Sequence, residues 1–255
     1  HREMSGTPKR CTMVRDVDQW FACIMVEQEE EPQQTRTDIP RPAVGIDLGL
    51  TKLAVLSDGT VFPNPRHLSR SVRRVRSLQR GLSRKGIGSN NREKARTALA
   101  KAWRRVRRQR DDFTQKTSRF LVDNHGTIMF EELNIRNLTK NHNLASAIMD
   151  SAWGRLRRLT AYKAERRGGR VMLVNPSGTS QKCSGCGNVE RLELSDRTFT
   201  CSACGLTLDR DVNAARNILQ RGLERAPVEE KPLLVRRRIS KFAPVKQEAS
   251  GFIQR

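Results

Sequence analysis

The sequence predicts a mixed α/β protein with a small cysteine-containing insert. Three observations support this prediction. Short apolar runs rich in β-branched residues alternate with segments of helical periodicity, two closely spaced cysteine pairs lie towards the C-terminal end, and the composition is strongly basic. A chain of 255 residues has room for one catalytic domain with a small insert and can bury a core without disulfides.

The charge of the chain indicates its class of ligand. Lysine and arginine number 49 against 27 acidic residues, for a formal net charge of +22. A polyanion is the expected partner of so basic a chain. A basic surface of the ribosomal type is an alternative, and its partner would also be a polyanion. The charge therefore says nothing about catalysis.

The hydropathy pattern excludes a membrane span. No apolar run approaches the roughly 18 residues that a span needs, and no charged segment followed by an apolar one opens the chain. We expect a soluble, reduced, intracellular protein. The chain begins with His1 and its first methionine is Met4, which indicates the tail of a longer reading frame.

The N-terminal third is expected to hold two strand pairs. Over residues 9–27, two apolar runs flank a turn-like segment at Arg15 to Asp18, which predicts a β-hairpin. Residues 28–42 are acidic and marked by proline, as is typical of a linker. In residues 43–62, two β-rich runs are joined by a glycine-bearing turn, and Asp47 lies in the first run.

The next segment is unusually basic. Residues 66–110 contain 17 lysines and arginines against a single acid, Glu93. Apolar residues at helical spacing predict a helical hairpin over 66–124 that is broken near residues 86–90. A solvated basic face is one interpretation, and a surface that follows a phosphate backbone is the one we favour. The candidate contacts are Arg73, Arg74, Arg76, Arg80, Arg84, Arg104, Arg105, Arg107 and Arg108.

The C-terminal half alternates strands and helices. We expect a short strand at 127–130 that ends at Glu131, a helix from about 145 to 167 that stops at a glycine pair, and a strand at 170–174. A helix from about 211 to 221 follows the cysteines. Beyond it the composition predicts a loosely ordered tail.

Four cysteines form two C-x2-C pairs separated by 14 residues, and each pair is followed by glycine. Zinc prefers four tetrahedral thiolates, and the glycines permit knuckle turns that direct backbone amides at the sulfurs. A closed set of four donors predicts a structural zinc rather than a catalytic one. Unligated thiols and a redox pair are the alternatives. The ligands are Cys183, Cys186, Cys201 and Cys204.

Three carboxylates stand at the ends of predicted elements: Asp47, Glu131 and Asp211. An acid at the end of an apolar strand is costly unless it is paired, hydrated or bound to a cation. Magnesium or manganese takes carboxylate oxygens, and two such ions about 4 Å apart support phosphodiester hydrolysis. Taken singly, each acid could also be an ordinary strand-end or helix-capping carboxylate.

The motifs VGIDLG, FEELNIRNL and NPSGTSQKCSGCGN…FTCSACGLTLDRDVNAARNIL resemble the RuvC-like nuclease part of the TnpB (OrfB) proteins of insertion sequences, relatives of the type V CRISPR effectors. The similarity covers about residues 6–220. It implies an RNase H-like (RuvC-like) mixed sheet with flanking helices, a basic helical hairpin insert and a zinc ribbon insert before the last acid. It also implies RNA-guided, magnesium-dependent DNA cleavage. Asp47, Glu131 and Asp211 match the three acidic positions, whereas Glu132 and Asp209 are only neighbours of them.

The resemblance also implies a division of the chain: a remnant hairpin and linker at 1–42, a RuvC-like core at 43–178 with the basic hairpin at 66–124, a zinc ribbon at 179–208, the last core helix at 209–222 and a flexible tail at 223–255. Guided members of the family carry a larger segment ahead of the core, which recognises the guide RNA and a short DNA motif beside the target. Here only the hairpin at 9–27 is similar to the last piece of that segment, so guided targeting by this chain is left open.

The favoured hypothesis is a transposon-encoded, RNA-guided DNA endonuclease that uses magnesium or manganese and holds a structural zinc. Its partners would be target DNA and a guide RNA, in the cytoplasm at the nucleoid, and it would be an accessory of a mobile element rather than its strand-transferring enzyme. The alternative is a catalytically silent remnant that binds nucleic acid. A zinc-ribbon subunit of a ribosomal or transcription complex ranks last, because it leaves the three acids unexplained.

Overall fold

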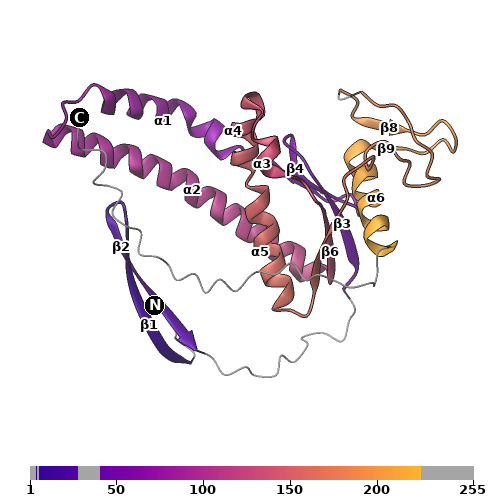
Figure 1. Ribbon diagram of the computed structural model, residues 1–255, viewed down its shortest axis with the longest axis horizontal. Coiled ribbons are helices and arrows are strands. Elements are labelled where there is room, and N and C mark those ends of the chain that lie inside the picture. The colour runs from indigo at the N-terminus through magenta and orange to yellow at the C-terminus, as the bar shows by residue number, and fades with distance from the viewer. Residues whose placement is uncertain (1–3, 5, 28–40, 194, 225–255) are drawn as a thin grey trace.

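A computed structural model describes residues 4, 6–27, 41–193 and 195–224, and Figure 1 shows how their elements are arranged. The strands are β1 (Thr7–Asp16), β2 (Gln19–Glu27), β3 (Ala43–Leu48), β4 (Lys52–Leu56), β5 (Val61–Pro63), β6 (Thr127–Glu131), β7 (Arg170–Val174), β8 (Thr198–Thr200) and β9 (Thr207–Asp209). The helices are α1 (His67–Ser83), α2 (Asn90–Asn124), α3 (Ile135–Leu138), α4 (His142–Ser151), α5 (Trp153–Glu165) and α6 (Arg210–Glu224). Most of the predicted linker and tail lies outside the described residues.

A five-stranded mixed sheet forms the centre of the fold, in the order β5-β4-β3-β6-β7. β3 runs parallel to β6, and β6 parallel to β7, while β4 is antiparallel to both β3 and β5. The sequence predicted β3 and β4 but not β5. Asp58 accepts a hydrogen bond from the Thr60 amide, and Gly59 adopts φ 92°, so a tight turn folds residues 61–63 back onto β4.

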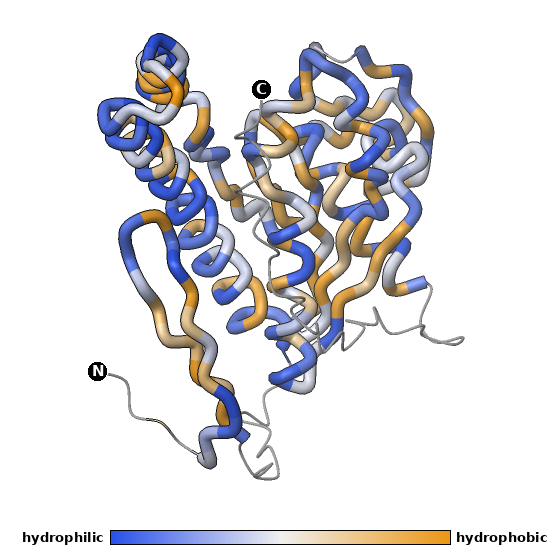
Figure 2. The backbone as a smooth tube through the Cα atoms, turned by 60° about the vertical axis from the view of Figure 1, so that its left-hand side comes forward, coloured by the Kyte–Doolittle hydropathy of each residue, from blue (hydrophilic) through white to orange (hydrophobic). Residues whose placement is uncertain are grey.

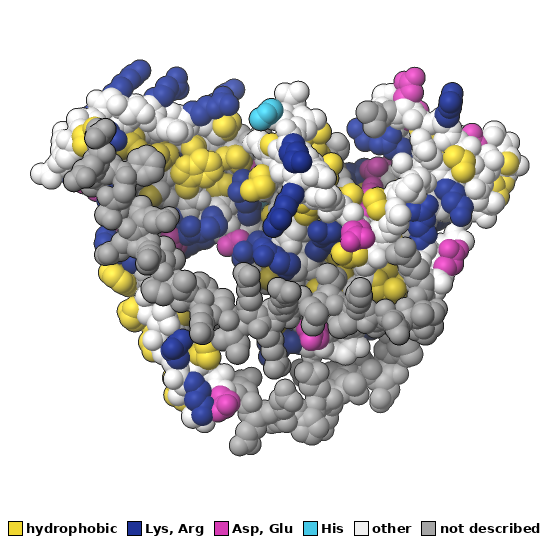
Figure 3. All heavy atoms as spheres, viewed as in Figure 1, with side chains coloured by type: hydrophobic (Ala, Val, Ile, Leu, Met, Phe, Trp, Pro, Cys, Tyr) yellow, Lys and Arg dark blue, Asp and Glu magenta, His cyan; other side chains and the backbone are white. Residues whose placement is uncertain are grey.

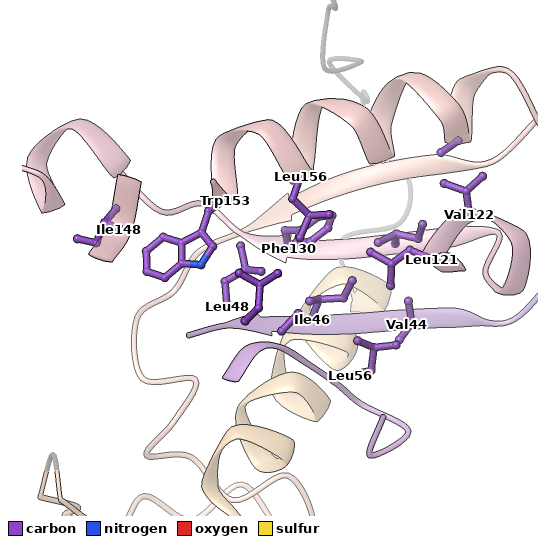
Figure 4. Close-up of a cluster of buried hydrophobic side chains, with 14 residues drawn as sticks. Val44, Ile46, Leu48, Leu56, Leu121, Val122, Phe130, Ile148, Trp153 and Leu156 are labelled. Carbon is purple, nitrogen blue, oxygen red and sulfur yellow. The ribbon is translucent and has the colours of Figure 1, made fainter. Parts of the chain in front are cut away.

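The larger core covers one face of this sheet. Alternate residues of β3, among them Val44 and Ile46, lie on that face with Phe130 of β6. They pack against Leu121 of α2 and Leu156 of α5, and Figure 4 shows these side chains gathered between the helices and the strands. All five are at most 1% exposed. The basic helical hairpin is thus anchored through the C-terminal part of α2.

The opposite face of the sheet is covered by α6. Met129 of β6 and Val174 of β7 point to this side and pack against Ile218, which is fully buried on α6. Figure 1 shows α6 on one side of the central strands, next to β3, and α5 on the other. Residues two apart on a strand point to the same face of the sheet. The residue two positions after Met129, at the end of β6, therefore also faces α6.

The single helix predicted from about 145 to 167 is wrong: the chain forms two helices, α4 and α5, that meet at Ala152. Ala152 has φ 53°, a left-handed conformation that ends α4. The end of α4 is held from another part of the chain, since Asp150 accepts from the Leu68 amide and forms an ion pair with Arg110 at 2.7 Å. These long-range contacts redirect the chain where local periodicity favours a continuous helix.

The predicted helical hairpin is present as α1 and α2, which pack together and are joined by residues 84–89. Ser89 caps α2 by accepting a hydrogen bond from the Arg92 amide. Figure 2 shows that hydrophilic residues predominate along this helical pair, whereas the central strands are mostly hydrophobic. A narrow stripe that includes Val75, Ala102 and Val106 is buried, so most of the surface of the two arms remains polar.

The predicted β-hairpin is also confirmed: β1 and β2 pair from Thr7 and Glu27 to Asp16 and Gln19. It lies apart from the main sheet, beside α2 (Figure 1). In the part of the chain that the structure describes, no helix has the length and apolar character needed to cross a membrane.

Candidate carboxylate and zinc sites

Two of the predicted acids lie side by side at one edge of the sheet. The parallel register pairs Ile46 of β3 with Phe130 of β6, and Asp47 and Glu131 are the residues that follow them. Parallel strands end at the same edge, and neighbouring residues in register point to the same face. Two carboxylates that are 84 positions apart in the sequence are therefore adjacent in the fold.

Both acids face α6. On β3, a Cβ at Gly45 would lie 2.1 Å from the Ala215 carbonyl oxygen of α6, so this glycine lets the helix cross directly over the strand. Asp47 is two residues further along and points to the same side. On β6, Met129 lies against Gly222 of α6, and Glu131 follows two residues later.

The third acid, Asp211, lies in the first turn of α6. Its side chain is 19% exposed, and its position at the N-terminal end of the helix brings it towards the strand ends that carry Asp47 and Glu131. The electrostatics agree with this arrangement. Burial, reinforced by the negative charges of Glu131 and Asp211, raises the pKa of Asp47 to about 7, while Arg210 and Lys52 oppose the rise.

Glu131 is held in a buried, hydrogen-bonded setting. It is 7% exposed, and the Thr179 hydroxyl lies 2.6 Å from its Oε1 atom. Burial raises the pKa of Glu131, and the hydrogen bond from Thr179 and the charge of Arg221 lower it in part. The adjacent Glu132 is exposed, so the two neighbouring acids lie in different environments.

Lys52 joins this cluster from the start of β4. Its Nζ atom lies 2.6 Å from Asp209 Oδ2 and 3.3 Å from Asp211 Oδ2. Burial lowers the pKa of Lys52, but the hydrogen bonds to the two carboxylates outweigh that effect and raise it. Asp209 also accepts from the amides of Asp211 and Val212, so it caps α6. Asp209 is therefore occupied by the helix terminus and by Lys52.

The three carboxylates form an open cluster. Among the described residues, the four cysteines are the one group of three or more His, Cys, Asp or Glu donors whose ligand atoms all lie within 4.8 Å of one another. The oxygens of Asp47, Glu131 and Asp211 therefore do not all lie within 4.8 Å of one another, although the charges of Glu131 and Asp211 act on Asp47.

The four cysteines do converge. Cys183 and Cys204 have their sulfurs 3.7 Å apart, and those of Cys186 and Cys201 are 3.5 Å apart. Four thiolates at a Zn–S distance of about 2.3 Å in a tetrahedron would have their sulfurs about 3.8 Å apart. The donor set and its spacing therefore fit zinc.

The two cysteine pairs have the same backbone turn. The Gly187 amide donates to the Cys183 carbonyl at 3.0 Å, and the Gly205 amide donates to the Cys201 carbonyl at 3.0 Å. Both glycines have positive φ, 83° and 73°. Behind the sulfurs, the fully buried Phe199 packs with Leu206 and its neighbours into a small core. The second pair leads through β9 into α6, so this ribbon is connected directly to the helix that carries Asp211.

The predicted basic contacts divide into two groups. Arg73, Arg74, Arg76, Arg80 and Arg84 are exposed on or just after α1. Arg73, Arg76, Arg80 and Arg84 line a shallow open depression, and Figure 3 shows positive side chains projecting along this edge of the molecule. Their spacing along one helix presents a row of cations to solvent. Such a row is suited to a phosphate backbone.

The second group lies on α2 and is engaged by the tip of the β1–β2 hairpin. Asp18 pairs with Arg104 at 2.7 Å, and Asp16 pairs with Arg107 at 2.6 Å and Arg108 at 3.2 Å. Arg104 is only 12% exposed at its side chain. Of the predicted α2 contacts, Arg105, Arg107 and Arg108 are exposed, and Arg104, Arg107 and Arg108 meet acidic side chains of this chain.

Sequence reasoning did not single out Lys52, Thr179, Asn213 or Asn217. A single lysine or threonine forms no recognisable sequence motif. A side chain that contacts a carboxylate can be identified only when the position of that carboxylate in the fold is known. One available signal was the pair of asparagines four residues apart in the first half of α6. They share a helix face that is otherwise apolar.

Comparisons with known proteins agree with this architecture. Residues 23–142 match a family model described as a probable transposase, and residues 153–218 match the Cas12f1-like TNB domain. The chain is 42% identical over 219 residues to a protein of Streptomyces pristinaespiralis named as a putative RNA-guided DNA endonuclease, covering 85% of this chain and 53% of that protein. It is 33% identical over 269 residues to the putative RNA-guided DNA endonuclease InsQ of Escherichia coli K12, covering 99% and 64%.

The fold is also found in solved structures. A Cas12f1 chain in a complex with sgRNA and target DNA superposes with a TM-score of 0.52 at 19% identity, over 73% of this chain and 52% of that one. The fold and the two sites define a mixed α/β protein that combines a carboxylate cluster with a four-cysteine metal-type site. The chain is similar in sequence to the TnpB (OrfB) proteins of insertion sequences, and it shares the fold of a type V effector, Cas12f1. It spans between about half and two thirds of the length of the two curated relatives above.

Proposed function

We propose that this chain is the nuclease part of a TnpB-type, RNA-guided DNA endonuclease that cuts phosphodiester bonds with two divalent cations. One observation carries the proposal. Asp47 and Glu131 are neighbours at the ends of two parallel strands, under a helix whose first turn bears Asp211. The relatives named as RNA-guided DNA endonucleases support the same activity.

The carboxylate cluster suits magnesium or manganese. These hard cations take carboxylate oxygens, and a site that holds three acids close together without enough positive charge to balance them attracts a cation. The raised pKa of Asp47 reflects that imbalance. When bound, a pair of such ions activates the attacking water and stabilises the leaving oxygen.

The residues of the chain have distinct roles in this proposal. Asp47 and Glu131 present oxygens from the rigid sheet edge, and Asp211 presents its carboxylate from the opposing helix. Lys52 is within reach of Asp211 and balances part of its charge. Asp209 keeps the first turn of α6 in place as its cap. The strands and the helix thus hold the donors before any substrate arrives.

The ribbon is proposed to hold a structural zinc through its four cysteines. Four sulfur donors within one small core leave no open position for substrate. We further assign residues 43–178 and 209–222 to a RuvC-like core, with α1 and α2 as its helical insert and residues 179–208 as the ribbon. In this scheme the insert contacts the nucleic acid phosphates, and target DNA and a guide RNA are the partners, at the nucleoid.

The test compares two adjacent acids. Purified chain is incubated with labelled single-stranded DNA and Mg²⁺ or Mn²⁺, and cleavage rates are measured for the wild type, Asp47→Asn, Glu131→Gln and Glu132→Gln. We expect losses above about 100-fold for the first two variants, since even the outer partners of metal ligands cost about 10–100-fold. Glu132→Gln is the matched control, because that side chain is exposed, and it should cut at the wild-type rate.

Two results would contradict the proposal. Cleavage by Glu131→Gln at the wild-type rate would show that the Glu131 carboxylate is not needed for the reaction. Salt-sensitive DNA binding with no cleavage at any concentration of either cation would instead favour the second candidate, a catalytically silent nucleic-acid-binding protein. The net charge of +22 supports binding in either case.

A further inference from the structure

Thr179 lies in the loop between β7 and the first cysteine pair, and it makes a buried contact with Glu131. Its hydroxyl is 2.6 Å from Glu131 Oε1, and the two residues are 3% and 7% exposed. The same hydroxyl is 3.0 Å from the Pro176 carbonyl. A hydroxyl has one proton, and an ionised carboxylate at the shorter distance is the stronger acceptor. Thr179 therefore donates to Glu131 when that acid is charged.

Two buried asparagines of α6 fix the loop that carries Thr179. Asn217 Nδ2 donates to the Thr179 carbonyl at 2.8 Å and to the Lys182 carbonyl at 2.6 Å. Asn213 Nδ2 donates to the same Lys182 carbonyl at 2.7 Å, and its Oδ1 accepts from the Ser184 amide at 2.9 Å. Both asparagines are at most 2% exposed.

These contacts connect the two sites. Lys182 and Ser184 flank Cys183, so the asparagines hold the first cysteine knuckle and the Thr179 loop against one helix. Asp211 stands in the first turn of that helix. A continuous series of short hydrogen bonds therefore runs from the knuckle through α6 and Thr179 to the Glu131 carboxylate. Glutamate has three rotatable side-chain bonds, and a fixed donor on one oxygen removes most of that freedom.

We propose that Thr179 is the positioning residue for Glu131, and that through it the cysteine ribbon sets the geometry of the divalent-cation site. The hydroxyl holds one carboxylate oxygen and leaves the other for a cation. This inference rests on the proposed function, because it assumes that Glu131 is a ligand. Partners that hold ligand carboxylates in this way commonly change metal affinity by about 10–100-fold when they are removed.

The experiment measures cation binding directly. Free Mn²⁺ is followed by electron paramagnetic resonance during titration of the full chain, and zinc content is determined for each variant. Thr179→Val keeps the shape and removes the hydroxyl, and Thr179→Ser restores it. Thr160→Val is the matched control, because Thr160 is fully buried and its hydroxyl bonds to the Leu156 carbonyl of its own helix, at 2.9 Å.

We expect Thr179→Val to retain zinc and to bind Mn²⁺ about 10–100-fold more weakly. Thr179→Ser and Thr160→Val should bind close to the wild-type level. Cleavage by Thr179→Val should fall, and the loss should diminish at high Mn²⁺ concentration, which a general loss of folding would not produce.

The outcomes separate the inference from the function. If Glu131→Gln weakens Mn²⁺ binding but Thr179→Val does not, the positioning role is wrong and the proposed nuclease site stands. If the wild type binds no better than Glu131→Gln, the proposed site fails and the inference fails with it. Weak binding by Thr179→Ser equal to that of Thr179→Val would also overturn the inference, since the hydroxyl would not be the cause.

Discussion

Asp47 carries an unfavourable negative charge. It lies at the end of an apolar strand, next to Glu131 and across from Asp211, and these surroundings raise its pKa to about 7. Burial and two neighbouring carboxylates all oppose its ionisation. In the proposed function a divalent cation would relieve the repulsion, and it would then compete with protons for this group.

This competition makes a pH-dependent stability difference the first prediction. Without divalent cations, the folded chain keeps a proton on Asp47 up to about pH 7, whereas the unfolded chain loses it near the ordinary value of 3.8. Between those values the folded state holds more protons, so the free energy of unfolding should fall as the pH rises from about 4 to about 7. Urea unfolding of zinc-bound protein across this range measures the effect.

Asp47→Asn is the control for that measurement, since its side chain does not titrate. The fall in stability with pH should be smaller in this variant, and saturating Mg²⁺ should reduce it in the wild type. Parallel pH profiles for the wild type and Asp47→Asn would show that Asp47 ionises normally and that the three acids do not interact as the structure indicates.

Asp209 and Asp211 are two similar residues, close in the sequence, that take different roles. Asp209 uses one oxygen to cap α6 and the other to bind Lys52. Asp211 lies within the first turn of the helix and meets Lys52 only at 3.3 Å. The sequence alone assigned the catalytic position to Asp211 by resemblance, and the capping hydrogen bonds supply a physical reason why Asp209 is less available.

Helix α6 is the element that brings both sites together. It follows directly from the cysteine ribbon, bears Asp211, fixes the Thr179 loop through its asparagines, and packs on the face of the sheet that carries Asp47 and Glu131. Its close approach to β3 depends on Gly45. An added Cβ there would lie 2.1 Å from the Ala215 carbonyl oxygen and 2.5 Å from the Leu219 amide nitrogen, both of which are backbone atoms.

The second prediction therefore concerns Gly45→Ala. The helix must move away from the strand, and overpacking of this kind usually costs about 1–3 kcal/mol. We expect a loss of stability in that range by urea unfolding, together with weaker Mn²⁺ binding because Asp211 moves with the helix.

Gly81→Ala is the matched control. Gly81 lies in α1, where an added Cβ meets nothing within 4 Å. Alanine in a helix interior is favoured over glycine by about 0.5–1 kcal/mol, so this variant should be slightly more stable than the wild type. A Gly45→Ala chain as stable as Gly81→Ala would contradict the packing of α6 on β3.

The whole molecule divides its positive charge between two surfaces. The arginines of α1 face solvent, whereas three of those on α2 are partly neutralised by Asp16 and Asp18 of the β1–β2 hairpin. Surface ion pairs of this kind contribute little to stability. They do, however, reduce the net charge that α2 offers to a phosphate backbone.

The third prediction follows from this division. Replacing Arg76 or Arg80 by alanine should weaken DNA binding and reduce the salt slope of binding by about 1 for each phosphate that the arginine neutralises. Replacing Arg104 or Arg107 should have a smaller effect, because those guanidinium groups already face carboxylates. Binding isotherms at several salt concentrations measure both effects, and equal losses of affinity from substitutions on α1 and α2 would contradict the division.

Several features of the whole chain were predictable from the sequence. The spacing of Cys183, Cys186, Cys201 and Cys204 predicted their convergence, because a short turn between paired cysteines has few possible forms. The hairpin β1–β2, the helical pair α1 and α2, and the strands β3, β4, β6 and β7 were also predicted, because their apolar patterns are local. The order of the strands was not, since it depends on contacts between distant segments.

The sequence by itself determined the β1–β2 hairpin, the helical pair, four strands of the central sheet, the cysteine cluster, the basic charge and, through resemblance, the three acids to examine. Only the tertiary structure decided that β3 and β6 are neighbours, that the chain breaks at Ala152, that Asp16 and Asp18 cover part of α2, and that Thr179 holds Glu131. The physical reason is the range of the interactions. Periodicity and turn chemistry act over a few residues, so they can be recognised in the linear sequence. A buried hydrogen bond between residues 48 positions apart exists only once the sheet and α6 have packed.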